Sequence, residues 1–267
     1  MDRLLFLGVG AIARAVRRAL PDLPAAGSTR SAPDARFASL TAIPASDADA
    51  IRMAAEGAHV LVSFPPDGQS DAQFAELCTR AAGVTYLSSS AVYSSGVVTE
   101  ATRATEVGER AQLRLTAEAT WRALGASIVR LPAFYGSTSG LHLSLARGTF
   151  RMPGSGSNLV SRVHEDDAAS FVLAAFRAPH GSLLLAGDTE PASVAEVVGF
   201  VCELFGLPTP ARSEGEAIPL SLRNDRRIDN RVTRARFGIE LRYPTFREGY
   251  RALRARVAQP GPSDLPG

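Results

Sequence analysis

Short apolar runs alternate with longer segments of helical periodicity along the first half of the chain. The apolar runs predict buried strands at Leu4–Leu7, Ala25–Thr29, His59–Phe64, Val84–Ser88 and Ser127–Leu131. The segments between them predict helices at Ala11–Leu20, Asp71–Ala82 and Arg110–Leu124. Strands that alternate with helices are typical of right-handed βαβ units, so the pattern predicts an α/β fold with a doubly wound parallel sheet.

The second half of the chain is less regular. Ser137–Ser161 is rich in Gly and Ser, and we expect a loop region there with room for one short helix. Glu165–Ala178 and Ser193–Phe205 have helical periodicity, and Ser182–Ala186 predicts one more strand. The Pro- and Gly-rich residues 259–267 predict a flexible tail.

Composition excludes several kinds of chemistry. All 29 basic residues other than histidine are arginines, so there is no lysine for a Schiff base, a pyridoxal-phosphate anchor or a P-loop. The net charge of +2 gives no general attraction to nucleic acid or anionic membranes. Cys78 and Cys202 are expected to be buried free thiols. With no signal-like N-terminus and no long apolar run, we expect a soluble cytoplasmic protein that does not contact membranes.

A glycine-rich turn links the first predicted strand to the first predicted helix. Gly8 and Gly10, followed by Ala11, Ile12 and Ala13, form a G-x-G-x-x-A pattern. In this context Gly8 permits a tight turn, Gly10 lets a pyrophosphate approach the backbone, and Ala13 permits close packing of helix on strand. The free N–H groups of the helix would bind the phosphates, so the pattern predicts a dinucleotide site.

The residues after the second predicted strand bear on the choice of cofactor. An NAD site usually carries Asp or Glu there, to bind the ribose hydroxyls. This chain has Ser28 and Arg30 instead, and both suit a 2′-phosphate. NADP(H) is therefore favoured over NAD(H). The alternative is that Arg30 is an ordinary surface arginine.

Three further segments carry a family resemblance. Tyr86–Tyr93 (YLSSSAVY) is similar to Y-L-S-S-[ST]-x-V-Y-G, and Val129–Gly136 (VRLPAFYG) is similar to L-R-x-x-x-I-Y-G. Ser161–Ala168 (SRVHEDDA) is similar to N-x-I-H-V-D-D-[LV]-A. With closing segments at Arg227–Arg231 and Arg242–Gly249, the chain resembles an atypical branch of the extended short-chain dehydrogenases/reductases, the NAD-dependent epimerase/dehydratase-like family.

The resemblance implies a domain organisation and cofactor contacts. It implies a Rossmann-like core from residues 1–136 and roughly 162–190, and a small substrate lobe from residues 137–161 and 191–258. It also implies that the cofactor lies near Ser63, Pro65, Ser88 and Pro132. Family members often dimerise through two helices that here include Asp71–Ala82 and Arg110–Leu124, so a homodimer is an expectation.

The catalytic motif of the family is absent. Counting back from Glu118, the Tyr and Lys of Tyr-x-x-x-Lys fall on Arg110 and Arg114. Arginine is too basic to act as a general acid or base near neutrality. Three interpretations stay open. In the first, another group carries the proton, and the candidates are Ser89, Tyr93, Tyr135 and His164. Alternatively, Arg110 binds an anionic substrate or stabilises developing charge, or the site is chemically silent.

We therefore expect an NADP(H)-dependent enzyme, an oxidoreductase or an epimerase/dehydratase, acting on a small polar or anionic and perhaps nucleotide-linked substrate. The rival hypothesis is a non-catalytic NADP(H) sensor or scaffold, and a weaker one is a non-redox isomerase or lyase. The four histidines show no ligand spacing, so no metal is expected. Eleven arginines lie in Arg223–Arg256, but interspersed acids favour a solvated face over nucleic-acid binding.

Overall fold

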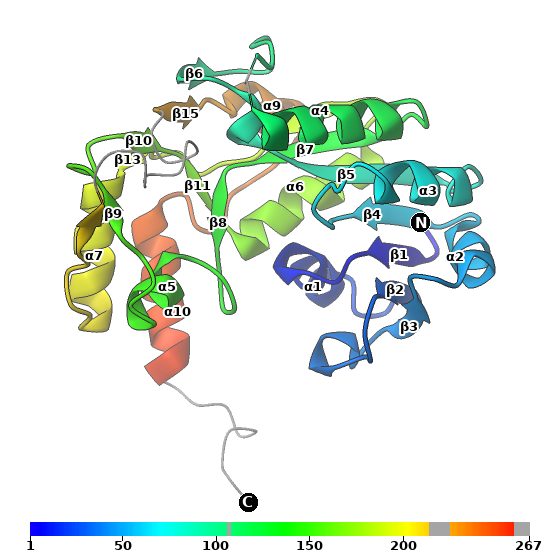
Figure 1. Cartoon of the computed structure of the whole chain (residues 1–267), viewed down its shortest axis with the longest axis horizontal. Helices are drawn as coiled ribbons and strands as arrows, with labels where there is room; N and C mark the ends of the chain where they lie inside the picture. Colours follow the sequence, from blue (N-terminus) through cyan, green and yellow to red (C-terminus); the bar gives the residue numbers. More distant parts are fainter. Residues whose placement is uncertain (106–107, 214–224, 259–267) are drawn as a thin grey trace, which may run out of the picture.

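A seven-stranded parallel sheet forms the centre of the molecule (Figure 1). The computed structural model describes residues 1–105, 108–213 and 225–258. The strand order is β12-β7-β5-β4-β1-β2-β3. The strands are β1 (Leu4–Leu7), β2 (Ala25–Thr29), β3 (Thr41–Pro44), β4 (His59–Val62), β5 (Gly83–Ser89), β7 (Ser127–Leu131) and β12 (Leu183–Leu185). The chain winds outward from β1 in both directions, which confirms the predicted doubly wound α/β sheet.

Helices cover both faces of this sheet. α1 (Ala11–Ala19) and α6 (Glu165–Arg177) pack on the face to which Leu4 and Phe6 of β1 point. Leu5 and Leu7 point to the opposite face, against the three remaining helices of the core. These helices are α2 (Ala48–Ala55), α3 (Ser70–Leu77) and α4 (Glu109–Arg122).

The core contains a buried tryptophan and two buried cysteines. A buried hydrogen bond of 2.7 Å from the indole N–H of Trp121 to Asp71 Oδ1 joins α4 to α3. Both cysteines are buried free thiols, as predicted. Within the described ranges, no helix combines the length and hydrophobicity needed to span a bilayer.

A second, smaller body lies beyond the carboxyl ends of the core strands, on the left of Figure 1. Its helices are α5 (Leu141–Ala146), α7 (Val194–Phe205) and α10 (Phe246–Ala258), whereas α9 (Arg231–Phe237) packs on the core, where Thr233 Oγ1 accepts from the N–H of Leu185 in β12. Its strands form the sheet β13-β10-β15-β6 and the parallel pairs β11/β8 and β14/β9. Their bounds are β6 (Gly96–Val98), β8 (Ala133–Tyr135), β9 (Met152–Pro153), β10 (Leu159–Val160), β11 (Arg162–His164), β13 (Ala192–Ser193), β14 (Arg212–Ser213) and β15 (Arg226–Ile228).

An apolar cluster separate from those on the two faces of the sheet holds this body together. It gathers side chains from β8, α5, α7 and α10, among them Tyr135, Leu145, Val201, Phe246 and Tyr250. The assignment of residues 137–161 and 191–258 to a substrate lobe stays a prediction. The predicted flexible tail, residues 259–267, lies outside the described residues.

Several elements differ from the sequence prediction. The pattern gave no sign of β3, α2, α9 or α10, nor of the short 3₁₀ helices η1 (Ala35–Phe37) and η2 (Ser90–Val92). In the region expected to be a loop with one short helix, α5 is that helix, and β9 and β10 were not expected. α3 ends at Leu77 rather than Ala82, and β4 ends at Val62 rather than Phe64. Most of the missed elements are short, and arginines interrupt the apolar positions of α10, so their apolar periodicity is weak.

Candidate functional site

The glycine-rich turn lies between β1 and α1, where the ends of β2 and β4 hold it in place. The N–H of Gly8 donates to Ser28 Oγ over 3.1 Å, and Ser63 Oγ donates to the carbonyl of Gly8 over 2.7 Å. Gly8 has a φ of +92°, and a Cβ there would lie 3.0 Å from the amide nitrogen of Phe64. Glycine at this position is therefore required by the fold itself.

Gly10 has a different environment. It is the N-cap of α1, and a Cβ at this position would meet no atom within 4 Å. No side chain caps the helix, and its first turn holds no acidic residue. The first N–H groups of α1 thus keep their partial positive charge for an external anion. Ile12 and Ala13 are buried beneath this turn, and Ala11 begins the helix.

A cavity of about 370 Å³ opens beside this turn. Six of the residues that the sequence assigned to the cofactor line it: Gly8, Gly10, Ser28, Arg30, Ser63 and Pro65. Phe37, Phe64 and Phe74 supply apolar walls, and Arg36 adds a second guanidinium. Among the described residues that line the cavity, none is a carboxylate. Uncapped N–H groups, apolar walls and open space at Gly10 fit a dinucleotide.

Both arginines of the cavity are paired with acids outside it. Arg30 Nη2 lies 3.3 Å from Asp67 Oδ2, and Arg36 Nη2 lies 2.8 Å from Asp34 Oδ2. The hydrogen bonds from Arg36 hold the pKa of Asp34 below its ordinary value. The pKa of Asp67 is lowered mainly by hydrogen bonds from Ser70 and Gln69, and Arg30 contributes less. The place of Arg36 at the cavity was not predicted from the sequence, because η1, the turn that presents it, lacks apolar periodicity.

The end of β5 carries two serines with different environments. Ser88 is buried, and its hydroxyl donates to Glu118 Oε1. It therefore faces α4 rather than the cavity, in contrast to the expectation that it contacts the cofactor. Ser89 is half-buried, and its Oγ accepts from the N–H of Ala91 at the start of η2. Pro132 is buried between β7 and β8 and does not line the cavity beside the glycine-rich turn.

The two arginines on α4 differ in exposure. Arg110 is exposed in the first turn of the helix. Arg114 is half-buried one turn later, and its Nη1 donates to the carbonyl of Leu87 in β5 over 3.1 Å. Arg114 therefore fixes α4 to the strand that ends at Ser89, and it brings positive charge to the carboxyl end of the sheet.

Comparison with solved structures covers almost the whole chain. A functionally unknown conserved protein from Silicibacter pomeroyi is 27% identical, with a TM-score of 0.83 over 97% of this chain and 100% of that one. A dTDP-glucose 4,6-dehydratase from Streptomyces venezuelae, solved with NAD, is 18% identical, with a TM-score of 0.80 over 95% of this chain and 96% of that one. A UDP-glucuronic acid 4-epimerase from Bacillus cereus, solved with UDP-glucuronic acid and NAD, is 14% identical, with a TM-score of 0.78 over 97% and 99%.

The chain has the extended short-chain dehydrogenase/reductase fold. This confirms the resemblance drawn from the ordered motifs. No family model matches the sequence, and the curated proteins contain no match. The fold is thus shared over almost the whole chain with structures that are 14–27% identical in sequence.

Within this extended short-chain dehydrogenase/reductase fold, the side chain of Tyr93 lies in the interior. Its side chain is 1% exposed, and its hydroxyl accepts from Arg130 Nη1 over 2.6 Å. Arg130 also pairs with Glu118 through two hydrogen bonds, of 2.9 and 2.6 Å. Burial raises the pKa of Tyr93 above its ordinary value. Tyr93 therefore belongs to a buried ion-pair network, and its part in proton transfer stays a prediction.

Tyr135 is likewise a packing residue here. It is 1% exposed and stacks on Tyr250 of α10 with ring centroids 4.3 Å apart. Burial raises the pKa of its hydroxyl, which has no hydrogen-bond partner in the described part of the chain. Tyr135 therefore packs inside the smaller body, and its part in proton exchange stays a prediction.

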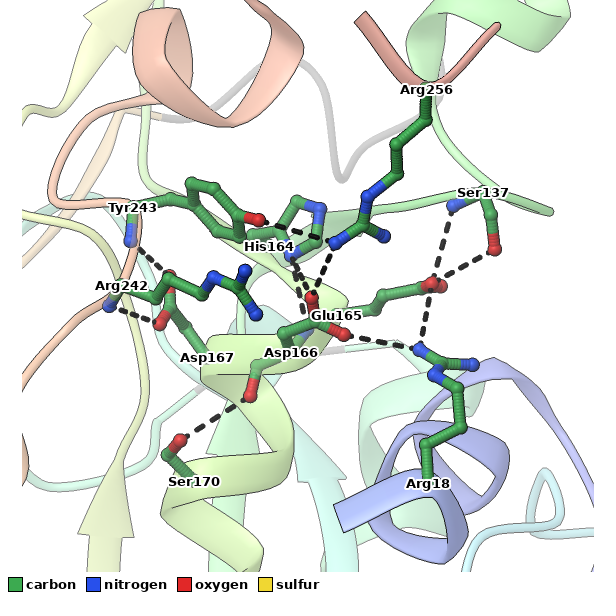
Figure 2. Close-up of polar contacts among 10 residues, drawn as sticks. All are labelled: Arg18, Ser137, His164, Glu165, Asp166, Asp167, Ser170, Arg242, Tyr243 and Arg256. Carbon is green, nitrogen blue, oxygen red and sulfur yellow. Dashed lines mark hydrogen bonds and ion pairs between the residues drawn. The ribbon is translucent and has the colours of Figure 1, made fainter. Parts of the chain in front are cut away.

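Polar contacts converge on the N-terminus of α6 and join it to three other parts of the fold (Figure 2). Arg18 of α1 lies 3.1 Å from both Glu165 and Asp166. Ser137 donates its N–H and its hydroxyl to Glu165, and Arg256 of α10 lies 3.5 Å from Asp166. The cofactor helix α1, the segment after β8, and α10 therefore meet at one polar junction.

His164 caps this junction. Its Nδ1 accepts from the N–H of Asp166 over 3.1 Å, and its ring packs on Tyr135 and Tyr243. Burial lowers the pKa of His164 to about 4, although Asp166 and Glu165 act in the opposite direction. The ring is therefore neutral near pH 7 and caps α6, and its part in proton transfer stays a prediction.

Proposed function

We propose that this chain binds NADP(H) and acts as an atypical member of the extended short-chain dehydrogenases/reductases. The observation that carries the proposal is the cavity beside the uncapped N-terminus of α1, which is lined by Arg30 and Arg36 and, among its described residues, by no carboxylate. Guanidinium groups bind a 2′-phosphate, whereas the ribose hydroxyls of NAD(H) are usually bound by an acid. The similar dehydratase and epimerase were solved with NAD, so the proposed preference distinguishes this chain from them.

The residues at the carboxyl end of β5 support a catalytic role. The bound nicotinamide would supply or accept the hydride. Ser89 has the half-buried position suited to holding a substrate oxygen, and Arg114 places a fixed positive charge nearby. Because Tyr93 and Tyr135 are buried, we assign proton exchange to water rather than to either phenol.

The substrate proposed is a small polar or anionic carbonyl or hydroxyl compound. The exposed Arg110 would bind an anionic group of this molecule. The dehydratase and the epimerase act on dTDP-glucose and UDP-glucuronic acid, so a nucleotide-linked compound is within the proposed class. Loss of turnover in Ser89→Ala, with retained cofactor binding, is the expected result once a substrate is identified by nicotinamide absorbance.

The cofactor assignment is tested by calorimetric titration of the whole chain with NADPH, NADP⁺, NADH and NAD⁺. We expect tighter binding of the phosphorylated pair, and Arg30→Gln should weaken NADPH binding by about tenfold because a charge-assisted hydrogen bond is lost. Arg52→Gln, at an exposed arginine of α2 paired with Asp49, is the matched control. Equal affinities for NADPH and NADH would contradict the assignment.

A non-catalytic NADP(H) sensor is the second candidate function. It is favoured by the burial of both tyrosines and by the two arginines at the catalytic positions of α4. A sensor must bind the oxidised and reduced cofactors with different affinities, because only that difference can shift a partner's equilibrium. Equal affinities for NADP⁺ and NADPH would therefore argue against sensing.

A further inference from the structure

An ion pair joins an arginine of the proposed cofactor cavity to an acid just outside it. Arg30 follows β2 and lines the cavity, and Asp67 lies two residues after Pro65, which lines it as well. Arg30 Nη2 lies 3.3 Å from Asp67 Oδ2 and 3.4 Å from Ser70 Oγ. The guanidinium that suits a 2′-phosphate is thus already in contact with a carboxylate.

The carboxylate side of this pair is fixed by its own surroundings. Asp67 accepts from the N–H groups of Gln69 and Ser70 over 3.0 and 2.7 Å, and also from the hydroxyl of Ser70. These hydrogen bonds lower the pKa of Asp67 to about 2, so it is ionised throughout the neutral range. Asp67 therefore keeps its position and charge whether or not Arg30 is beside it.

Arg30 is held less firmly than Asp67. The side chain of Arg30 is 67% exposed and that of Asp67 41% exposed, and exposed ion pairs are weak because water and salt screen them. By contrast, Arg36 and Asp34 lie two residues apart in one turn, where Asp34 also accepts from the N–H of Arg36. Of the two ion pairs, the one between Arg30 and Asp67 connects separate segments. Arg30 can therefore exchange Asp67 for another anion.

We propose that Asp67 competes with the 2′-phosphate of NADP(H) for Arg30, and so sets how strongly the chain prefers NADP(H) to NAD(H). This inference rests on the proposed function. One guanidinium cannot keep its contact with Asp67 and also turn fully toward a phosphate, and the fixed carboxylate repels that phosphate. NAD(H) has no such group and leaves the pair intact. Asp67 is therefore a specificity-determining residue that limits the preference for NADP(H).

The experiment compares dissociation constants for NADPH and NADH in four forms of the whole chain. These are the wild type, Asp67→Asn, Arg30→Gln and the double variant. Asparagine retains an oxygen that can accept from the N–H groups of Gln69 and Ser70, so the turn before α3 keeps its support. Asp49→Asn removes the acid of another exposed aspartate–arginine pair, on α2, and is the matched control.

In Asp67→Asn we expect NADPH to bind about two- to fivefold more tightly, the range that loss of an exposed ion pair allows, while NADH changes little. In the Arg30→Gln background the same substitution should have a smaller effect on NADPH, because there is no guanidinium left to compete for. Asp49→Asn should leave both dissociation constants unchanged.

The outcomes separate this inference from the proposed function. A wild type that prefers NADPH, with an unchanged dissociation constant in Asp67→Asn, would overturn the inference and leave the NADP(H) assignment standing. A wild type that does not bind NADPH would overturn both. Weaker NADH binding in Asp67→Asn would also overturn the inference, since it would identify Asp67 as an acceptor for ribose hydroxyls.

Discussion

The two glycines of the turn between β1 and α1 have different surroundings. Gly8 is held at a φ of +92° with the backbone of Phe64 against it, whereas Gly10 borders open space. The same chemical change at these two positions therefore has different consequences. This contrast allows the cofactor site to be tested without first knowing a substrate.

Gly10→Ala should lower the melting temperature only slightly, because alanine is a poorer N-cap than glycine but the added methyl group meets no atom of the chain. It should weaken NADPH binding by about tenfold or more, since the methyl group occupies space that a pyrophosphate needs. Thermal denaturation and calorimetric titration check the two halves of this expectation. Gly8→Ala is the contrasting variant, which should lower the melting temperature by more. Full NADPH affinity in Gly10→Ala would show that no phosphate lies at this turn.

The candidate site was only partly predictable at the residue scale. The glycine turn, Ser28 and Arg30 are adjacent in sequence to strong strands, so local pattern placed them at the cavity. The surroundings of Tyr93 could not be predicted, because they depend on Arg130 and Glu118, which lie on β7 and α4. Such long-range partners leave no periodic signal in the neighbouring sequence.

Elements of the core and of the smaller body were predictable to different degrees. β1 and α1 have buried residues at the spacing of a strand and of a helix, and they were found from the sequence. β3 buries only Ile43, because it lies at the edge of the sheet, and α2 buries only Ile51 and Ala55. α10 was hidden by its arginines, which interrupt the apolar positions that pack against β8 and α7.

The packing of α10 on β8 requires a glycine at position 249. A Cβ on Gly249 would lie 2.1 Å from the hydroxyl oxygen of Tyr135, whose ring is fixed between Tyr250 and His164. We expect Gly249→Ala to lower the free energy of unfolding by about 1–3 kcal/mol through overpacking. Gly199→Ala, on an exposed face of α7 with no atom within 4 Å, should instead raise it by up to about 1 kcal/mol. Urea unfolding measures both, and equal effects of the two variants would contradict this account.

At the scale of the whole molecule, stability should depend on pH through two buried groups with opposite effects. Asp188 is 1% exposed, and its Oδ2 has no hydrogen-bond partner among the described residues. Burial raises its pKa from 3.8 to about 7, so the folded state keeps a proton that the unfolded state loses. This contribution to stability is complete below about pH 4 and is lost as the pH rises through 7. His164, with its pKa lowered to about 4, acts in reverse, and its contribution is lost as the pH falls from 6.5 toward 4.

Asp188→Asn should therefore become more stable relative to the wild type as the pH rises. Between about pH 4 and pH 8 we expect the difference in unfolding free energy to change by about 1–3 kcal/mol in favour of the variant. Urea unfolding at several pH values measures it, with Asp49→Asn, at an exposed carboxylate, as the control. A difference that is constant across this range would show that Asp188 is ionised in the folded protein.

The contact between Trp121 and Asp71 has an optical consequence. The chain contains one tryptophan, and its indole is buried between α3 and α4. A shielded indole fluoresces at shorter wavelength than a hydrated one, so its emission moves to the red when the two helices separate. That emission overlaps the absorption of reduced nicotinamide, so Trp121 would be an energy-transfer donor to NADPH or NADH bound at the proposed site. The single tryptophan would thus report both the integrity of the core and the arrival of reduced cofactor, without any attached dye.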